Sequence, residues 1–357
     1  MPHNLHLYHT VLKQIEQWLP QMRVTQRRNL ALLVTGMLAS QRIHLSYIVN
    51  SWHLAGRVVS LTNRLRRFLA NERIAVWQWY QPVAAQLLRS LSRQRLWLVL
   101  DSTKVGQNHR VLVVGLAYRR RTLPLAWSVH GGRRGQTGHQ AQIALLQRLA
   151  PLIAPHTEVW VLGDTEFESI HLLRWLQQQQ WHFIIRQRGA IKVSPDGQEW
   201  TNINMLPLQE GERRPMGWVR LTEKYNAGWF FLVLHWAKGA DEPWYLVSDC
   251  NDSAFILRRY QRRMWIEQMY GDMKGHGFDL EATHLLHAER IARLMLGICI
   301  AFVASICLGV WVVKRGFRSL VDHKSRRDKS YFRIGRDWLQ RCQRLGAPVQ
   351  LHFKPYF

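Results

Sequence analysis

The segment from Leu294 to Val313 constrains the fold most strongly, because Ser305 is the one conventionally polar side chain in it. A segment of this length and composition must be buried either in a lipid bilayer or in the interior of a large domain. Basic residues flank it on both sides, at Arg293 and at Lys314, so no positive-inside asymmetry fixes an orientation in a membrane. We therefore favour a core helix packed against a sheet, and a membrane span is the alternative.

The charge of the chain indicates a polyanionic partner. Lys and Arg total 49 against 24 Asp and Glu, which gives a net charge of +25 in a sequence that is 47% hydrophobic and therefore globular. Nucleic acid is the first candidate, and an anionic membrane surface is the second. The four cysteines form no CxxC pair, which argues against a disulfide scaffold or a zinc site. Since the first residues also lack a secretory signal pattern, we expect a cytoplasmic protein.

The hydrophobic period changes along the chain. Up to about residue 90, apolar residues recur at three- and four-residue spacing, which predicts helices. From Arg95, three short apolar runs ending near residue 130 predict antiparallel strands, and alternating helix and strand patterns follow as far as Arg186. The expected fold class is therefore α/β with a mixed sheet.

These patterns divide the chain into five expected regions. They are a helical DNA-binding domain at residues 1–92, the first part of an α/β core at 93–187, a β-rich insertion at 188–243, the second part of the core at 244–315, and a basic, partly helical C-terminal tail at 316–357. Interleaved arginines suggest that the first region contacts DNA and that the tail contacts phosphates or a partner subunit. Solvated surfaces are the alternative for both regions.

Residues 260–274 predict one amphipathic helix. At about 100° per residue, four polar side chains fall on one face: Tyr260, Arg263, Glu267 and Lys274. Apolar residues, including Trp265, fall on the opposite face. A carboxylate between two cations suits a site where a bound metal ion and nucleic-acid phosphates compensate each other's charge. An ordinary solvated helix face is the alternative.

Two aspartates supply further carboxylates. Asp101 ends the apolar run from Arg95, and Asp164 ends a second run from Glu158, so both are expected at the carboxyl ends of strands. Each aspartate alone is a weak indication, because an aspartate after a strand most often caps a turn. Together with Glu267, however, they provide three hard oxygen ligands, which suit a pair of divalent cations in phosphoryl transfer.

At these residues the chain resembles DDE transposases of the insertion-sequence four (IS-four) type. The signature of that family is Tyr, two residues, Arg, three residues, Glu, six residues and Lys, and residues 260–274 match it without a gap. LVLDST around Asp101 and VLGDTEF around Asp164 precede it in the order of the family. The resemblance covers the chain from about Arg95 to Arg315, and more loosely the helical start and the tail.

The resemblance implies a fold, an activity and partners. The fold would be an RNase H-like core interrupted by the β-rich insertion, with two Mg²⁺ ions, replaceable by Mn²⁺, on Asp101, Asp164 and Glu267. A homodimer would bridge two transposon ends and move the element by cut-and-paste transposition, through strand nicking, hairpin formation and strand transfer into target DNA. The resemblance implies no membrane partner, and it implies a bacterial, nucleoid-associated protein.

The resemblance also assigns DNA contacts. Tyr260, Arg263 and Lys274 would hold the terminal phosphates, and Arg186 resembles a phosphate-contacting arginine. Trp244, in PWYLVSD, matches the family tryptophan that stacks on a flipped base during hairpin formation.

One departure concerns a second tryptophan, which related enzymes place directly after the signature arginine. Here Met264 occupies that position and Trp265 follows it, so the helix angles assign Trp265 to the core.

Besides a membrane-anchored basic protein, which the apolar segment 294–313 would suggest, two other functions are alternatives to an active transposase. The first is a catalytically silent DNA-binding protein of transposase descent, whose expected sign, the loss of an acidic residue, is absent from this sequence. The second is another RNase H-like nuclease such as a junction resolvase, which the cations around Glu267 and the long insertion disfavour.

Overall fold

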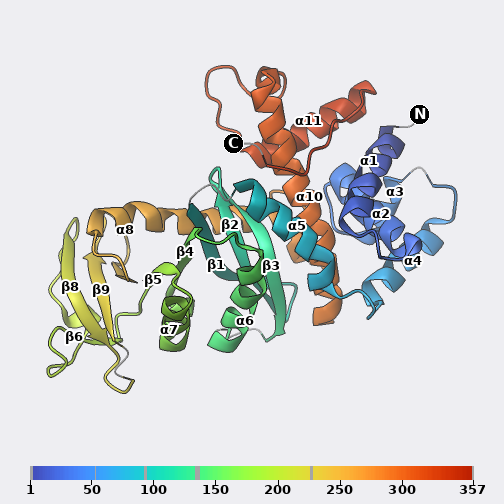
Figure 1. Ribbon diagram of the computed structural model, residues 1–357. Coiled ribbons are helices and arrows are strands. Elements are labelled where there is room, and N and C mark those ends of the chain that lie inside the picture. Colours follow the sequence, from blue (N-terminus) through green and yellow to red (C-terminus); the bar gives the residue numbers. More distant parts are fainter. Residues whose placement is uncertain (1–2, 53, 92–94, 133–136, 226–227, 356–357) are drawn as a thin grey trace.

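The computed structural model describes residues 3–52, 54–91, 95–132, 137–225 and 228–355. The architecture is mixed α/β, with one large sheet, a helical group beside one end of it, and a C-terminal helical pair that projects from the sheet (Figure 1). The α/β prediction with a mixed sheet is therefore confirmed.

The N-terminal part is helical, as the spacing of its apolar residues predicts. Its helices are α1 (His3–Trp18), α2 (Val24–Ser40), α3 (Leu45–Asn50), α4 (Val58–Ala70) and α5 (Val76–Leu91). Helix α2 is buried through its middle, from Leu30 to Leu38, because α1, α3 and the C-terminal helices surround it. The role of residues 1–92 in DNA binding stays a prediction.

The sheet has ten strands in the order β3-β2-β1-β4-β5-β10-β9-β8-β6-β7. The strands are β1 (Arg95–Val105), β2 (His109–Tyr118), β3 (Arg121–Gly131), β4 (Glu158–Gly163), β5 (His182–Arg186), β6 (Lys192–Ser194), β7 (Thr201–Asn202), β8 (Arg213–Leu221), β9 (Trp229–His235) and β10 (Trp244–Ser248). Strands β1, β4 and β5 are parallel to one another, and every other pairing is antiparallel. The strands of the predicted insertion join this same sheet, because β9 pairs with β10 and β10 pairs with β5.

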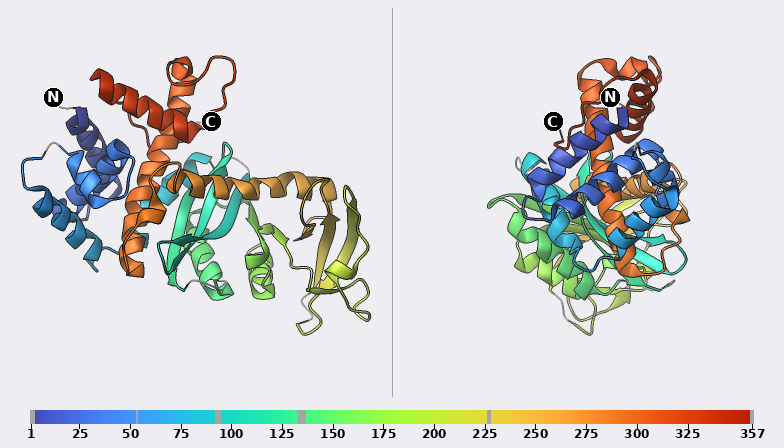
Figure 2. Two further views of the ribbon diagram at one scale, coloured as in Figure 1. Left: turned by 180° about the vertical axis from the view of Figure 1, so that it is seen from behind. Right: turned by 90° about the vertical axis from the view of Figure 1, so that its right-hand side faces the viewer.

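Helices cover both faces of the sheet. Helices α6 (His139–Leu149) and α7 (Ile170–Gln178) lie on the face seen in Figure 1, and the run from α8 (Ser253–Tyr260) into α9 (Trp265–Met273) crosses the opposite face, seen in the left panel of Figure 2. Short 3-10 helices connect these elements at Ala150–Leu152, Thr165–Phe167, Ile203–Met205, Gln261–Met264, Leu280–Ala282 and Phe317–Leu320. With helices on both faces, the central strands are apolar on both sides.

The apolar segment 294–313 forms most of α10 (Ala288–Lys314). The helix is long and apolar enough to cross a membrane, but 89% of its apolar window is buried inside the protein. It packs against α2, α4, α5, β3 and α11, between the N-terminal helices and the sheet (Figure 2). Buried Arg293 donates to the main-chain oxygens of Leu69 at 3.0 Å and Ile74 at 3.4 Å, near the C-terminus of α4. These contacts favour the core-helix interpretation.

Helix α11 (Tyr331–Leu345) folds back onto α10 at very short range. A Cβ atom placed on Gly309 would lie 1.8 Å from the main-chain oxygen of Tyr331, and one on Gly335 would lie 1.9 Å from that of Ser305. No side chain larger than hydrogen fits at either position, so the two glycines set the distance between the helices.

The prediction of one helix over residues 260–274 is wrong. Helix α8 ends at Tyr260, a 3-10 turn spans Gln261–Met264, and α9 ends at Met273. A 3-10 turn advances each residue by about 120° instead of about 100°, so four such residues rotate the following helix by roughly 80° from the predicted phase. The four signature residues therefore do not belong to one regular helix.

Candidate active site

Asp101 lies on β1 beside the C-terminal end of β4. Its predicted place at the end of a strand is wrong, since β1 continues to Val105 through its pairing with β2. The parallel pairing with β4 nevertheless stops just before it, at Val99 opposite Leu162. Because side chains alternate along a strand, the register extended by two residues brings Asp101 level with Asp164 on the same face.

Asp164 directly follows β4, as predicted. It caps a short 3-10 helix, where its Oδ1 accepts a hydrogen bond from the Glu166 main-chain nitrogen at 2.9 Å. The capping role that sequence reasoning kept as the alternative is therefore real. Its second oxygen remains available and accepts from Arg263 Nη2 at 2.7 Å.

Glu267 lies in the first turn of α9, and its side chain is half exposed. One guanidinium joins it to the two aspartates. Arg263 contacts Glu267 through its Nη1 atom. Its Nη2 atom lies 2.7 Å from a carboxylate oxygen of Asp164 and 3.6 Å from one of Asp101. Three carboxylates, from β1, from the end of β4 and from α9, therefore converge on Arg263. The first and the last of them, Asp101 and Glu267, are 166 positions apart in the sequence.

The electrostatics of this cluster are unbalanced at Asp101. Burial raises the pKa of Asp101 from 3.8 to about 7, the Arg263 guanidinium opposes that rise, and the Asp164 carboxylate adds to it. A buried carboxylate with too little compensating charge favours protonation or a cation. The pKa of Arg263 is raised, since its interactions with these carboxylates outweigh its burial.

The donor set suits a hard divalent cation by its chemistry, because all three groups are carboxylates and Asp101 is undercompensated. Among the described residues, no group of three or more His, Cys, Asp and Glu side chains is arranged closely enough to hold a metal ion. The physical reason at this cluster is that the Arg263 guanidinium occupies the space between the carboxylates. A metal ion bound there would have to replace it.

Tyr260 and Trp244 adjoin the cluster. Tyr260 is buried, its ring lies 5.1 Å from that of Trp244 at 73°, and its pKa is raised by burial. The carboxylates of Asp101 and Asp164 also act on this pKa, which places the phenol within electrostatic reach of them. Arg186 acts on the same phenol, and it pairs with Glu242 at 2.7 Å.

Two further residues of this segment are Lys274 and Trp265. Lys274 directly follows α9 and pairs with Glu281 at 2.9 Å. The assignment of Trp265 to the core is wrong, because Trp265 is half-buried with Arg262 over its ring at 5.7 Å, while Met264 packs against the core instead. The 3-10 turn before α9 accounts for the exchange.

Sequence reasoning missed Glu166, a nearly buried carboxylate beside the cluster. Its Oε1 accepts from the Thr137 nitrogen at 3.0 Å and hydroxyl at 2.6 Å, and its Oε2 accepts from the Ser102 hydroxyl at 2.6 Å and from Arg110 at 3.0 Å. Through its hydrogen bond with Ser102, Glu166 thus connects the 3-10 helix that follows Asp164 with the strand that carries Asp101. Its one indication in the sequence is its position, two residues after Asp164.

Tyr270 was also missed. It is buried on α9, and its hydroxyl donates to the main-chain oxygen of Asp101 at 2.9 Å. This bond fixes the Glu267 helix to the strand that carries Asp101. Its spacing from Glu267 fits any core tyrosine, so the sequence gives no sign of this contact.

Comparison with known proteins places the chain in a family. No curated protein matches it. Among solved structures it is similar to a piggyBac transposase, in a cryo-EM structure of the synaptic complex with hairpin DNA, with 11% identity, a TM-score of 0.48, and coverage of 98% of this chain and 83% of that chain. The family model for the transposase DDE domain matches residues 92–304, about three fifths of the 357 residues. The chain therefore belongs to the transposase DDE domain family.

Proposed function

We propose that this protein is an active DNA transposase of the insertion-sequence four (IS-four) type, with an RNase H-like catalytic core. The convergence of Asp101, Asp164 and Glu267 on one guanidinium carries the proposal, because three acidic side chains from distant parts of the matched region meet at one point. The gapless signature at residues 260–274 supports the IS-four type. The reaction would be cut-and-paste transposition by strand nicking, hairpin formation and strand transfer.

The three carboxylates would hold the divalent cations, two Mg²⁺ per site with Mn²⁺ as a substitute. Bound there, the cations would supply activation of the attacking hydroxyl and stabilisation of the leaving oxygen. Arg263 would leave its position between the carboxylates and pair with a DNA phosphate, since the charge it now balances would be balanced by metal. Glu166 and Tyr270 would keep the two aspartates and the Glu267 helix in register.

The other site residues would contact DNA. Arg186 and Tyr260 lie beside the cluster and would hold phosphates near the cleaved bond. Trp244 packs edge-on against Tyr260 and would swing toward a flipped base during hairpin formation. Lys274, now paired with Glu281, would contact the strand farther from the cleaved bond.

The partners would be double-stranded DNA, as terminal inverted repeats and as target, and a second copy of the chain in the complex with both ends. The net charge of +25 supports a DNA partner. The helical region 1–92 would bind the element ends, and the basic tail would contact phosphates or the second copy. We place the protein in the bacterial cytoplasm, associated with the nucleoid.

Glu267→Gln tests the proposal, because it removes one charge and keeps the shape of the side chain. The expected result is nearly unchanged binding of element-end DNA in Ca²⁺ and a loss of Mg²⁺-dependent cleavage of at least about a hundredfold. The matched control is Glu289→Gln, an exposed glutamate in the first turn of α10, which should cleave like the wild type. Cleavage retained in Glu267→Gln would remove Glu267 from the catalytic residues, and DNA binding without cleavage by the wild type would favour the silent DNA-binding alternative.

A further inference from the structure

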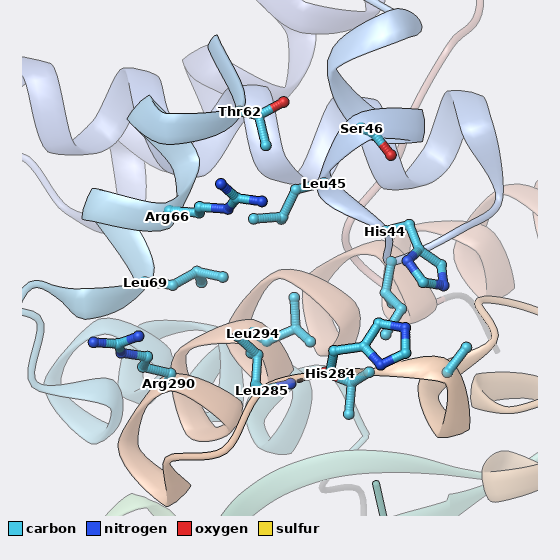
Figure 3. Close-up of a pocket in the computed structure, with 13 residues that line it drawn as sticks. His44, Leu45, Ser46, Thr62, Arg66, Leu69, His284, Leu285, Arg290 and Leu294 are labelled. Atoms are coloured by element: carbon cyan, nitrogen blue, oxygen red, sulfur yellow. Dashed lines mark hydrogen bonds between the residues drawn. The ribbon is translucent and has the colours of Figure 1, made fainter. Parts of the chain in front are cut away.

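A cavity of about 350 Å³ lies between the N-terminal helices and the segment that follows α9 (Figure 3). Its walls come from α3 and α4 on one side and from residues 282–294 on the other. The volume is at the lower end of the range for ligand sites, about 300 to 1,000 Å³. A volume of this size suits one small ligand, such as a single nucleotide.

The cavity has two chemically different ends. Figure 3 shows Arg66 and Arg290 at one end, the imidazoles of His44 and His284 at the other, and leucines between them. The two imidazole rings lie 5.6 Å apart. The pocket is therefore polarised along its length, with positive charge at one end and flat aromatic rings at the other.

The charge of this cavity is uncompensated. None of its thirteen lining residues is acidic. Within the described part of the chain, the Arg290 guanidinium has no hydrogen-bond or ion-pair partner, and that of Arg66 donates to Asn63 at 3.1 Å and to no carboxylate. Guanidinium groups without a carboxylate partner, beside an apolar wall, match a ligand that carries both a phosphate and a flat ring.

We propose that this cavity binds one unpaired nucleotide of the DNA substrate. Arg66 and Arg290 would pair with its phosphate, the leucines would cover its sugar, and its base would stack against the imidazoles of His44 and His284. An inorganic phosphate would leave the leucine wall unused, and an apolar peptide would leave the two arginines unpaired. This inference rests on the proposed function and identifies a nucleotide site separate from Trp244.

The position of the cavity relative to the carboxylates predicts which nucleotide it holds. Gly106 directly follows β1, and a Cβ atom on it would lie 3.4 Å from Thr283, which lines the cavity. Five residues of extended chain separate Asp101 from Gly106, a distance of about 17 Å. At 3.4 Å per nucleotide of a strand, the bound nucleotide would be about five positions from the cleaved phosphate.

The test measures binding of duplex element ends in Ca²⁺ by fluorescence anisotropy. Each duplex carries one mismatched nucleotide, moved in turn through about the third to seventh position from the cleavage point, and is compared with the same duplex in which that nucleotide is abasic. For the wild type, one position should weaken binding about tenfold, as expected for loss of one stacked base. In His284→Ala, the same abasic site should cost much less, because one of the two imidazoles on which the base stacks has been removed. Such non-additivity identifies a direct contact.

The arginine end is tested with Arg290→Ala. Removal of one phosphate contact should weaken binding of every duplex and reduce the slope of log affinity against log salt by about 0.9. The matched control is Arg148→Ala, an exposed arginine on α6, outside this cavity, which should leave that slope unchanged. Thermal melting confirms that each variant is folded.

The outcomes separate this inference from the proposed function. If the wild type binds and cleaves element ends but the effect of every abasic position is unchanged in His284→Ala, the nucleotide site is refuted and the transposase proposal stands. Equal salt slopes for Arg290→Ala and the wild type would likewise refute the phosphate contact. If the wild type binds no element end, the proposed function fails first.

Discussion

Replacement of Asp101 by Asn should stabilise the metal-free protein at alkaline pH. Burial raises the pKa of Asp101 from 3.8 to about 7, so above pH 7 the fold holds an ionised carboxylate that it disfavours. A difference of about three pKa units corresponds to about 4 kcal/mol. Because the pKa of about 7 already includes the attraction of Arg263, 3.6 Å away, we expect Asp101→Asn to gain up to about 4 kcal/mol at pH 8.

The pH dependence of this effect has a definite sign. A folded-state pKa above the unfolded value means that the stability from protonated Asp101 is fully present below pH 3.8 and is lost as the pH rises through about 7. The difference between Asp101→Asn and the wild type should therefore be near zero at pH 4, grow between pH 4 and 7, and level off above.

The assay is urea unfolding in EDTA, measured across this pH range. Asp328→Asn, at an exposed aspartate, is the control and should show no such pH-dependent gain. A gain that does not vary with pH, or a loss of stability at pH 8, would refute the electrostatic reasoning.

Three further predictions follow from other contacts. Glu166→Gln should lower cleavage about 10- to 100-fold with element-end binding retained, because Ser102, Thr137 and Arg110 lose the carboxylate that orders them. The control is Glu199→Gln, at an exposed glutamate, and equal cleavage by the two variants would disprove the positioning role of Glu166. Gly309→Ala should lower the free energy of unfolding by about 1 to 3 kcal/mol, since its Cβ would meet the Tyr331 main chain, and unchanged urea unfolding would contradict the close packing of α10 and α11. Trp244→Ala should permit first-strand nicking but reduce hairpin yield on denaturing gels; a normal yield would leave Trp244 with only its packing against Tyr260.

Hydrophobic periodicity predicted most of the secondary structure, because burial imposes the period directly. Helices before residue 92, the three antiparallel strands after Arg95 and the buried helix over 294–313 all follow from it. Periodicity could not reveal the 3-10 turn at Gln261–Met264, since a change from about 100° to 120° per residue over four positions leaves the sequence pattern intact. That turn moved Trp265 out of the core.

The three acidic residues of the candidate site were predicted from the sequence, but the place where their side chains converge was not. Asp164 lies at the end of its strand, whereas β1 runs four residues past Asp101, because β2 continues to pair with it after β4 has ended. The length of a strand depends on its neighbours, which one sequence does not specify. Glu166 escaped notice for the same reason, since Ser102 and Thr137 reach it only through tertiary contacts.

The most direct measurement of the central claim is cleavage of a labelled duplex that carries the end of the element encoding this protein. The wild type in Mg²⁺ should give nicks and hairpins on a denaturing gel, and Asp101→Ala, Asp164→Ala and Glu267→Ala should each abolish them while Asp328→Ala retains them. Cleavage that survives the loss of any one of the three carboxylates, or a wild type that binds the end and cuts no strand in either Mg²⁺ or Mn²⁺, would contradict the account.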